Sequence, residues 1–337
     1  MAKHAALLVN LGSPDSYEVP DVKVYLREFL MDKRVIDYPW FFRFLLIEGI
    51  ILRTRPPKSA EAYKSIWWDE GSPLIVLSRK LQESVQKHTN IPVGLGMRYG
   101  NPSIEHGLKQ LVLENPDLKE VKLIPLYPHY AMSSFETVVV KAREVVEKYF
   151  KELKLKVQDP FYKDQDYITA LSKSLSVALV KEYDHVLFSY HGIPERHIRK
   201  SDITGNHCLK SENCCSTDSP AHAYCYRHQV FKTTELVVKE LGIPEGKYSN
   251  SFQSRLDDKW LRPFTDKQLA ELPKRGIKKL IVLCPAFVSD CLETIEEIGE
   301  EGREIFIEAG GEGFILVPCL NDQDDWVKVV ANWCEND

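Results

Sequence analysis

Short apolar runs alternate with longer stretches of helical periodicity along the chain. This alternation is typical of βαβ units, in which helices connect the strands of a parallel sheet. The clearest helical pattern lies at residues 133–150, where Ser133 and Glu136 have the spacing of a capping box. We predict eight strands, at residues 5–11, 91–97, 121–127, 153–159, 184–190, 247–253, 278–284 and 313–319.

Eight strands can form one sheet, a barrel or two sheets of four. The polar stretch at residues 159–166 interrupts the pattern near its middle and favours two similar four-stranded halves. We therefore expect an α/β protein with halves at 1–162 and 163–320. A C-terminal helix at 321–337 is expected to pack back on the first half.

Composition narrows the class of protein. The 337 residues carry a net charge of −5, without the basic stripe of a nucleic-acid binder. No window is apolar over the roughly 20 residues of a membrane span, and the apolar run near the N-terminus is too short for a signal peptide. We expect the cytoplasm, where the eight cysteines stay mostly reduced and a cysteine cluster suggests a metal before a disulfide.

Polar residues follow the predicted strands, at the edge where parallel α/β sheets bind ligands. A single histidine at a strand end, such as His191 in SYHGIP, is usually structural. Here other polar residues also follow predicted strands and are expected near His191, which favours a functional site over a structural role. The residues expected to share a cleft with it are Ser72, Arg98, Tyr99, Tyr127 and Glu293.

A row of carboxylates follows the seventh predicted strand. Asp290, Glu293, Glu297 and Glu301 are spaced by three, four and four residues, which places them on one helical face. A solvated acidic surface is one interpretation. The other is a row that holds or passes a divalent cation, since carboxylate oxygens bind such ions without trapping them.

Residues 40–52, WFFRFLLIEGIIL, are almost entirely aromatic or aliphatic but too short to cross a bilayer. They fit a buried core helix. They also fit a hydrophobic rim around a large flat ligand or a patch that rests on a membrane, with Arg53 and Arg55 near carboxylates or lipid headgroups.

A polar insertion at 207–225 contains Cys208, Cys214, Cys215 and Cys225. A four-thiolate iron–sulfur cluster and a zinc site, with His207 or His222 replacing one thiolate, both fit this spacing. The remaining cysteines are scattered, and we expect them to be small buried apolar side chains: Cys284, Cys291, Cys319 and Cys334.

Seven ordered stretches resemble the ferrochelatases, which insert ferrous iron into a porphyrin. They are LLVNLGSPD (7–15), GSPL (71–74), GMRYGNPS (96–103), PLYPHYAMSSFET (125–137), SYHGIPERH (189–197), FQSR (252–255) and CPAFVSDCLETIEEIGEEGREIF (284–306). The resemblance implies two Rossmann-like halves of the class II chelatase type, with a porphyrin cleft between them. It covers almost the whole chain.

The resemblance also assigns roles. His191 matches the catalytic histidine and Glu293 the essential glutamate of the family. Glu297 and Glu301 match the acidic face beside that glutamate, and Asp290 matches its neighbour. The residues that match positions lining the porphyrin pocket or holding its propionates are Tyr63, Ser72, Arg98, Tyr99 and Tyr127.

At three positions this sequence has a different residue from particular branches of the family. Leu11 stands where the coproporphyrin-using branch has an iron-coordinating Tyr, which favours protoporphyrin IX. Cys291 replaces a histidine of animal relatives, and Met132 replaces their internal cluster cysteine. The 207–225 insertion is instead similar to that of bacterial members with a [2Fe–2S] cluster, so this cofactor is expected, with structural zinc as the alternative.

Alternatives to the protoporphyrin enzyme are a coproporphyrin ferrochelatase, a cobalt or nickel chelatase and a non-catalytic porphyrin or haem carrier. Cobalt and nickel chelatases usually need two histidines at the metal, and FVSDCLET (287–294) contains none. The expected partners are protoporphyrin IX and ferrous iron, with no nucleic acid. Peripheral attachment to the inner face of the membrane through 40–52 and a homodimer stay open.

Overall fold

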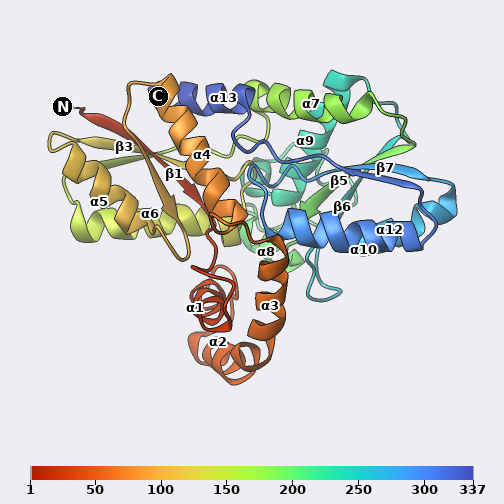
Figure 1. Cartoon of the computed structure of the whole chain (residues 1–337), viewed down its shortest axis with the longest axis horizontal. Helices are drawn as coiled ribbons and strands as arrows, with labels where there is room; N and C mark the ends of the chain where they lie inside the picture. Colours follow the sequence, from red (N-terminus) through yellow and green to blue (C-terminus); the bar gives the residue numbers. More distant parts are fainter. Residues whose placement is uncertain (1, 337) are drawn as a thin grey trace. The chain divides into compact units, whose positions relative to one another are not determined.

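The computed structural model describes residues 2–336, and all eight predicted strands are present in it (Figure 1). The strands form two parallel four-stranded sheets, ordered β2-β1-β3-β4 and β6-β5-β7-β8. The prediction of two four-stranded halves, rather than a barrel or one sheet, is confirmed. The strands are β1 (His4–Asn10), β2 (Val93–Met97), β3 (Glu120–Pro125), β4 (Lys154–Val157), β5 (His185–His191), β6 (Tyr248–Gln253), β7 (Lys279–Leu283) and β8 (Gly313–Leu316).

The chain divides into two units, each built on one sheet. The first unit comprises 1–127, 132–159 and 321–337, and the second comprises 128–131 and 160–320. The C-terminal helix α13 (Asp324–Glu335) therefore belongs to the first unit, where it packs on α4 (Pro73–His88).

Helices cover both faces of each sheet, because right-handed crossovers that lead to opposite sides of β1, and of β5, place their helices on opposite faces. In the first unit, α4 and α13 lie on one face, and α5 (Ile104–Glu114) and α6 (Thr137–Tyr149) lie on the other (Figure 1). Three further helices precede α4. They are α1 (Val19–Leu30), α2 (Trp40–Leu46) and α3 (Leu52–Ile66).

In the second unit, α7 and α9 cover one face of the sheet, and α10 and α12 cover the other (Figure 1). Its helices are α7 (Gln165–Leu179), α8 (Glu195–Ser201), α9 (Tyr226–Leu241), α10 (Thr265–Glu271), α11 (Leu292–Thr294) and α12 (Arg303–Glu308), with the short 3₁₀-helices η3 (Pro220–Tyr224) and η4 (Pro273–Arg275).

Local sequence explains where several helices begin and end. The Ser103 hydroxyl accepts a bond from the His106 N–H at the start of α5, and the Asp164 carboxylate does the same for Tyr167 at the start of α7. Helix α9 ends at Gly242, whose φ of 64° lies in the left-handed region that favours glycine.

Three segments wind as π-helices where the sequence pattern suggested α-helix: η1 (Ile47–Ile51), η2 (Met132–Glu136) and η5 (Ile295–Gly302). The predicted capping box at Ser133 and Glu136 therefore lies inside η2, and Ser133 is not the residue at which the helix begins. Glu136 occupies the N-cap position of α6 without a side-chain cap bond, and its carboxylate pairs with Arg34 at 3.0 Å. Isolated π-turns are rare and often mark functional sites.

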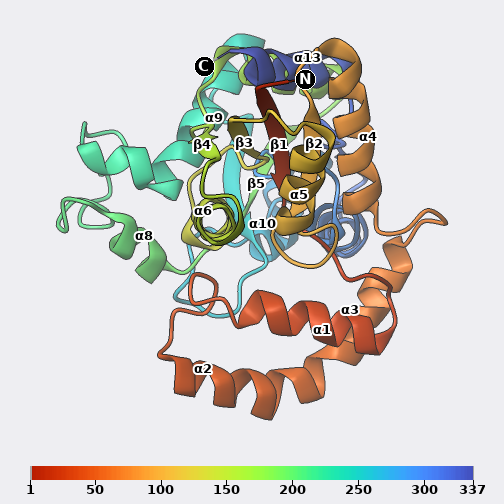
Figure 2. The ribbon, with the colours of Figure 1, turned by 90° about the vertical axis from the view of Figure 1, so that its left-hand side faces the viewer.

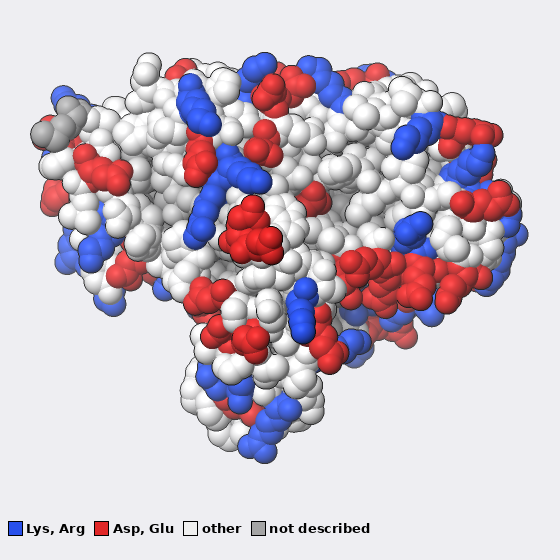
Figure 3. Space-filling model, in the orientation of Figure 1, with Lys and Arg blue, Asp and Glu red and all other residues white. Residues whose placement is uncertain are grey.

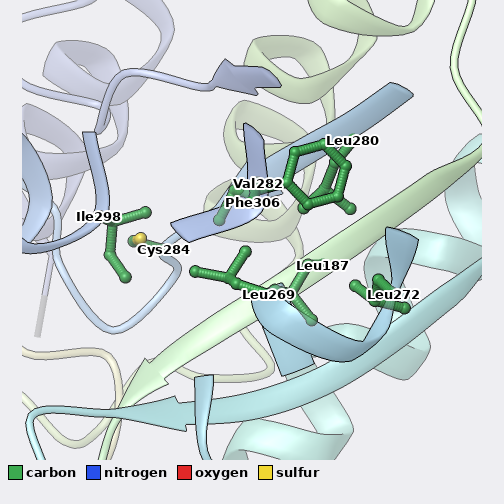
Figure 4. Packing of buried hydrophobic residues seen from close by; sticks show 8 residues of the cluster. All are labelled: Leu187, Leu269, Leu272, Leu280, Val282, Cys284, Ile298 and Phe306. Atoms are coloured by element: carbon green, nitrogen blue, oxygen red, sulfur yellow. The ribbon is translucent and has the colours of Figure 1, made fainter. Parts of the chain in front are cut away.

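The core of the second unit holds the segment that carries the predicted row of carboxylates, η5 and α12. Ile298 of η5 and Phe306 of α12 pack with Leu187, Leu269, Leu272, Leu280, Val282 and Cys284 (Figure 4). Because the apolar side of η5 and α12 faces this core, the glutamates of the same segment project elsewhere. Figure 3 shows acidic side chains gathered over the region of α10 and α12.

Residues 40–52 do not form a core helix. Trp40, Phe41, Phe42 and Ile50 are each about 60% exposed, while the charged Arg43 is buried. The Arg43 guanidinium donates to the carbonyls of Ile36 and Tyr38, at 3.2 and 2.9 Å. Figure 2 shows α2 at the outer side of the first unit, beyond α1. None of the helices in residues 2–336 has the length and hydropathy to cross a bilayer.

Candidate active site

His191 is the last residue of β5, after a completely buried run from His185 to Tyr190. Its Nδ1 lies 2.6 Å from the Gly192 carbonyl oxygen. Gly192 donates its N–H to the Gln253 carbonyl, and a Cβ at this position would lie 2.7 Å from that oxygen. Glycine therefore allows the close approach of β5 and β6 that fixes the histidine.

The charge of His191 is set by two opposing effects. Burial lowers the pKa of the imidazole, while the Glu293 carboxylate and the Gly192 carbonyl partly raise it. The Phe287 ring lies edge-on to the imidazole at 6.1 Å. The result is a neutral histidine beside a carboxylate, which is the protonation state of a general base.

Glu293 lies in α11 and interacts electrostatically with His191. Its backbone carbonyl accepts a 2.8 Å bond from Gln253 Nε2, and the Oε1 of the same Gln253 accepts from the Ser189 hydroxyl. Gln253 thus links the strand that carries the histidine to the helix that carries the glutamate.

Glu297 lies in η5 between Glu293 and Glu301, and both neighbouring carboxylates act on its charge. Burial is the main cause that raises the pKa of Glu297 to about 7. The Ser254 N–H and hydroxyl oppose this by donating to the two carboxylate oxygens, at 2.7 and 2.6 Å. Glu301 is exposed, so the row runs from a partly buried site to the surface.

A cavity of about 240 Å³ adjoins this row within the second unit. Glu297, Glu301 and Ser254 line it, together with an ion pair between Arg255 and Asp266 whose atoms lie 2.7 Å apart. The row is therefore accessible to water or a small ion along part of its length.

Asp290, the first predicted member of the row, has a local structural task. Its Oδ1 accepts bonds from the Thr294 hydroxyl at 3.0 Å and from the Cys319 N–H at 3.3 Å. These bonds help to shape the turn that leads into α11.

Arg98 in the first unit is held by a buried polar network. Its guanidinium pairs with Asp32 and donates to the Thr137 hydroxyl at 2.7 Å. The Tyr99 hydroxyl donates to Asp32 at 3.0 Å, and its ring stacks under the Arg98 guanidinium. Although burial opposes ionisation, bonds from Thr137 and its neighbours lower the pKa of Asp32.

The other predicted porphyrin contacts also lie in the first unit and differ in exposure. Tyr99, Tyr63 and Ser72 are buried, at 0, 8 and 4% exposure, whereas Leu11 and Tyr127 are partly exposed. Tyr99 is thus positioned to orient Arg98 and Asp32, with no surface of its own for a ligand.

The four cysteines of the insertion lie together. Cys208, Cys214 and Cys225 are each 2% exposed, and the thiols of Cys208 and Cys215 both hydrogen-bond with Cys225. Those bonds, the one from Cys215 above all, lower the pKa of Cys225 to about 6. The Arg227 guanidinium lies 3.6 Å from the sulfurs of both Cys214 and Cys215.

Three imidazoles surround the thiols but face the backbone. His207 and His222 place Nε2 within 2.6 and 2.9 Å of the Cys214 carbonyl, and His228 Nδ1 lies 2.7 Å from the Cys215 carbonyl. In both candidate zinc ligands, His207 and His222, Nε2 is therefore occupied by a backbone carbonyl, which leaves Nδ1 as the nitrogen for a metal. Among residues 2–336, no group of three or more His, Cys, Asp or Glu is arranged to hold a metal ion.

The donor type, though not the present arrangement of the side chains, suits a two-iron cluster, because such a cluster takes four thiolates divided between two irons. The remaining cysteines are buried, as predicted, at exposures of 2, 6, 5 and 8% for Cys284, Cys291, Cys319 and Cys334.

Sequence reasoning did not single out Asp32, Ser254 or Tyr226. Ser254 lies in the FQSR stretch, directly after a strand end, so its position gave a signal. Asp32 and Tyr226 follow helical stretches or polar loops without a recognisable motif, and only the fold brings them to Arg98 and His191.

The chain matches the family model described as ferrochelatase over residues 3–337. It is 52% identical to the ferrochelatase of Pseudomonas fluorescens (strain Pf0-1), over 99% of this chain and 98% of that protein. It is 52% identical to the ferrochelatase of Azotobacter vinelandii, over 99% of each chain.

Among solved structures, the chain is similar in fold to SirB from Bacillus subtilis with Fe³⁺, with a TM-score of 0.54 and 14% identity over 98% of this chain and 94% of that one. The sirohydrochlorin chelatase SirB in complex with cobalt gives a TM-score of 0.55 and 11% identity, over 99% of this chain and 94% of that one. From the family match and the full-length identity to its relatives, the chain belongs to the ferrochelatase family.

Proposed function

We propose that this metal-insertion enzyme takes protoporphyrin IX and ferrous iron, releases two protons and forms protohaem. The observation that supports this most directly is His191 beside Glu293 at the inner end of a row of glutamates that reaches the surface. Metal insertion needs a base for the pyrrole N–H groups and a path for a cation, and this arrangement offers both. Leu11 in place of a tyrosine supports protoporphyrin over coproporphyrin as the substrate.

His191 is proposed to accept a pyrrole proton. Burial keeps its imidazole neutral, so the ring can take a proton near neutral pH. The nearby Glu293 carboxylate then stabilises the imidazolium that forms, by the same charge interaction that raises the pKa of His191.

Glu293, Glu297 and Glu301 are proposed to carry iron inward or protons outward. With a pKa of about 7, Glu297 exchanges protons readily at neutral pH. Carboxylate oxygens bind Fe²⁺ less tightly than thiolates or imidazoles would, so the ion can move on. Asp290 supports the turn beside this row through Thr294 and Cys319.

The first unit is proposed to bind the porphyrin side chains and edge. Arg98, oriented by Asp32 and by the Tyr99 ring, offers a fixed cation for a propionate. Tyr63, Ser72, Tyr127 and Leu11 are proposed to belong to the same binding surface.

The thiols of Cys208, Cys214, Cys215 and Cys225 are proposed to hold a [2Fe–2S] cluster, a group whose chemistry is one-electron transfer. The adjacent sulfurs and the Arg227 guanidinium support this proposal, because a cation offsets the negative charge of four thiolates. A structural zinc ion with His207 or His222 as one ligand is the alternative, since a bond from one ring nitrogen to a backbone carbonyl is common in histidines that bind zinc through the other nitrogen.

The exposed side of residues 40–52 is proposed to contact a membrane surface from the cytoplasmic side. The aromatic side chains face outward, and Arg53, Arg55 and Lys58 on the adjoining helix are exposed, where lipid headgroups can meet them. Such contact suits an enzyme with an apolar substrate.

Substitution of the base tests the proposed function. His191→Ala is expected to abolish conversion of ferrous iron and protoporphyrin to protohaem, followed by the change in the porphyrin absorption spectrum, while fluorescence titration still detects porphyrin binding. Wild-type turnover by His191→Ala would refute the role of His191. A wild-type protein that binds protoporphyrin or haem tightly without turnover would instead identify a carrier.

A further inference from the structure

The backbone of His191 is held by a side-chain hydrogen bond in addition to its pairing within the sheet. The pairing of β5 with β7 ends at Phe188, whereas the pairing with β6 continues to His191. The end of β5 therefore has a strand on one side only. The Tyr226 hydroxyl donates a 2.9 Å bond to the His191 carbonyl oxygen.

Tyr226 is a rigid donor. Its side chain is almost fully buried, and the His129 ring packs edge-on against it at 5.8 Å and against Tyr190 at 5.6 Å. Burial lowers the pKa of His129 to about 3, so this ring stays neutral and adds no charge to the packing. The phenol cannot change direction without disturbing these neighbours.

Tyr226 also joins the cysteine segment to α9. Cys225 is the N-cap of α9 and Tyr226 is the first residue of this helix. Gln229, one turn later, donates to the carbonyls of His222 and Ala223 and accepts from the Tyr130 N–H at 2.7 Å. A shift of Cys225 therefore moves the first turn of α9, where the phenol is attached.

We infer that Tyr226 is a positioning residue that couples the order of the cysteine segment to the orientation of His191. This inference rests on the proposed function in two respects: His191 as the base and Cys225 as a ligand of the iron–sulfur cluster. It gives the cluster a structural task in metal insertion, without electron transfer. Because the bond reaches a backbone oxygen, its loss loosens the histidine while the imidazole itself is unchanged.

The first experiment compares Tyr226→Phe with Tyr190→Phe. Tyr190 is equally buried and packs on the same His129, but its hydroxyl bonds to Thr234 at 2.7 Å. Loss of one buried neutral hydrogen bond predicts a fall in kcat of about fivefold for Tyr226→Phe, with KM for porphyrin nearly unchanged. Tyr190→Phe should keep the wild-type kcat.

A second readout does not depend on turnover. In protein labelled at histidine, the His191 ring signal is identified by its absence from His191→Ala. The signal is expected to shift or broaden in Tyr226→Phe and to stay unchanged in Tyr190→Phe. An unchanged kcat together with an unchanged His191 signal in Tyr226→Phe would overturn the positioning role.

The coupling to the cysteine segment is tested with Cys225→Ser and the double variant. If Tyr226 carries the effect, Cys225→Ser shifts the same His191 signal, and adding Tyr226→Phe lowers kcat much less than it does in the wild type. Fully multiplicative effects, or a His191 signal insensitive to Cys225→Ser, would overturn the coupling. These outcomes differ from failure of the proposed function. If His191 is not the base, His191→Ala retains turnover, regardless of the result for Tyr226→Phe.

Discussion

Ser254 offers a direct way to move the charge of Glu297. Its hydroxyl donates a 2.6 Å bond to one oxygen of the Glu297 carboxylate. Hydrogen bonds to a charged group contribute about 1.5–3 kcal/mol, which corresponds to about one to two pH units. Ser254→Ala is therefore expected to raise the pKa of Glu297 from about 7 toward 8–9.

The assay is the initial rate of protohaem formation between pH 6 and pH 9. If ionised Glu297 passes iron or protons, the acidic limb of the rate profile should move up by about one to two pH units in Ser254→Ala. Ser172→Ala removes another buried serine hydroxyl, in α7, and should leave the profile unchanged. An acidic limb at the same pH in Ser254→Ala would refute the role given to Glu297.

The free energy of unfolding should also depend on the ionisation of Glu297, and it should fall as the pH rises. The folded protein holds the Glu297 proton more tightly than the unfolded chain, where the pKa is near 4.5, so stability falls as pH rises from about 4.5 through about 7. Ser254→Ala should lower the free energy of unfolding at pH 9 by about 1.5–3 kcal/mol and much less at pH 5.5.

Ser254 has a φ of 61°, in the left-handed region, so alanine there keeps an unfavourable backbone. Ser254→Gly removes the same hydroxyl and relieves that strain. A similar pH shift in both variants would assign the effect to the lost hydrogen bond rather than to the backbone.

Three further predictions concern other parts of the chain. Asp32→Ala leaves the largely buried Arg98 without its carboxylate and should lower the free energy of unfolding by about 3 kcal/mol, seen as a lower urea midpoint at unchanged slope. Cys214→Ser should remove the visible absorbance of the purified protein; a colourless wild type with stoichiometric zinc would contradict the cluster. Phe41→Glu with Phe42→Glu should abolish sedimentation with anionic vesicles, whereas Val177→Glu, at an exposed apolar position of α7, should not.

Most strands were predictable because their apolar runs are short, are bounded by turn residues and alternate with longer helical stretches. The strands β4 and β6 are more polar, with the sequences KLKV and YSNSFQ, and were predicted from their place in this alternation. The π-winding of η5 was not predictable from the pattern. A spacing of four residues between glutamates keeps them near one face in an α-helix and in a π-helix, so the two windings look alike in the sequence.

The site was predictable only in part. His191 ends β5 and Glu293 follows β7, and residues at the carboxyl ends of parallel strands are the first candidates for a ligand site. Asp32 and Tyr226 act through hydrogen bonds to residues far away in the sequence. Arg43 is buried because two backbone carbonyls accept its guanidinium N–H groups. Residue type alone would place an arginine at the surface and the phenylalanines inside.

Helix α13 has a consequence for synthesis. The first unit draws its sheet from residues before 159 but receives its last helix only from residues 324–335. At about 5–20 residues per second, translation reaches that helix roughly 10–35 s after β4 has been made. Trp326 and Val330, both fully buried, cover a face that is bare throughout this interval. The nascent N-terminal unit is therefore expected to need a chaperone until the final segment leaves the ribosome, and the second unit is free to fold before it.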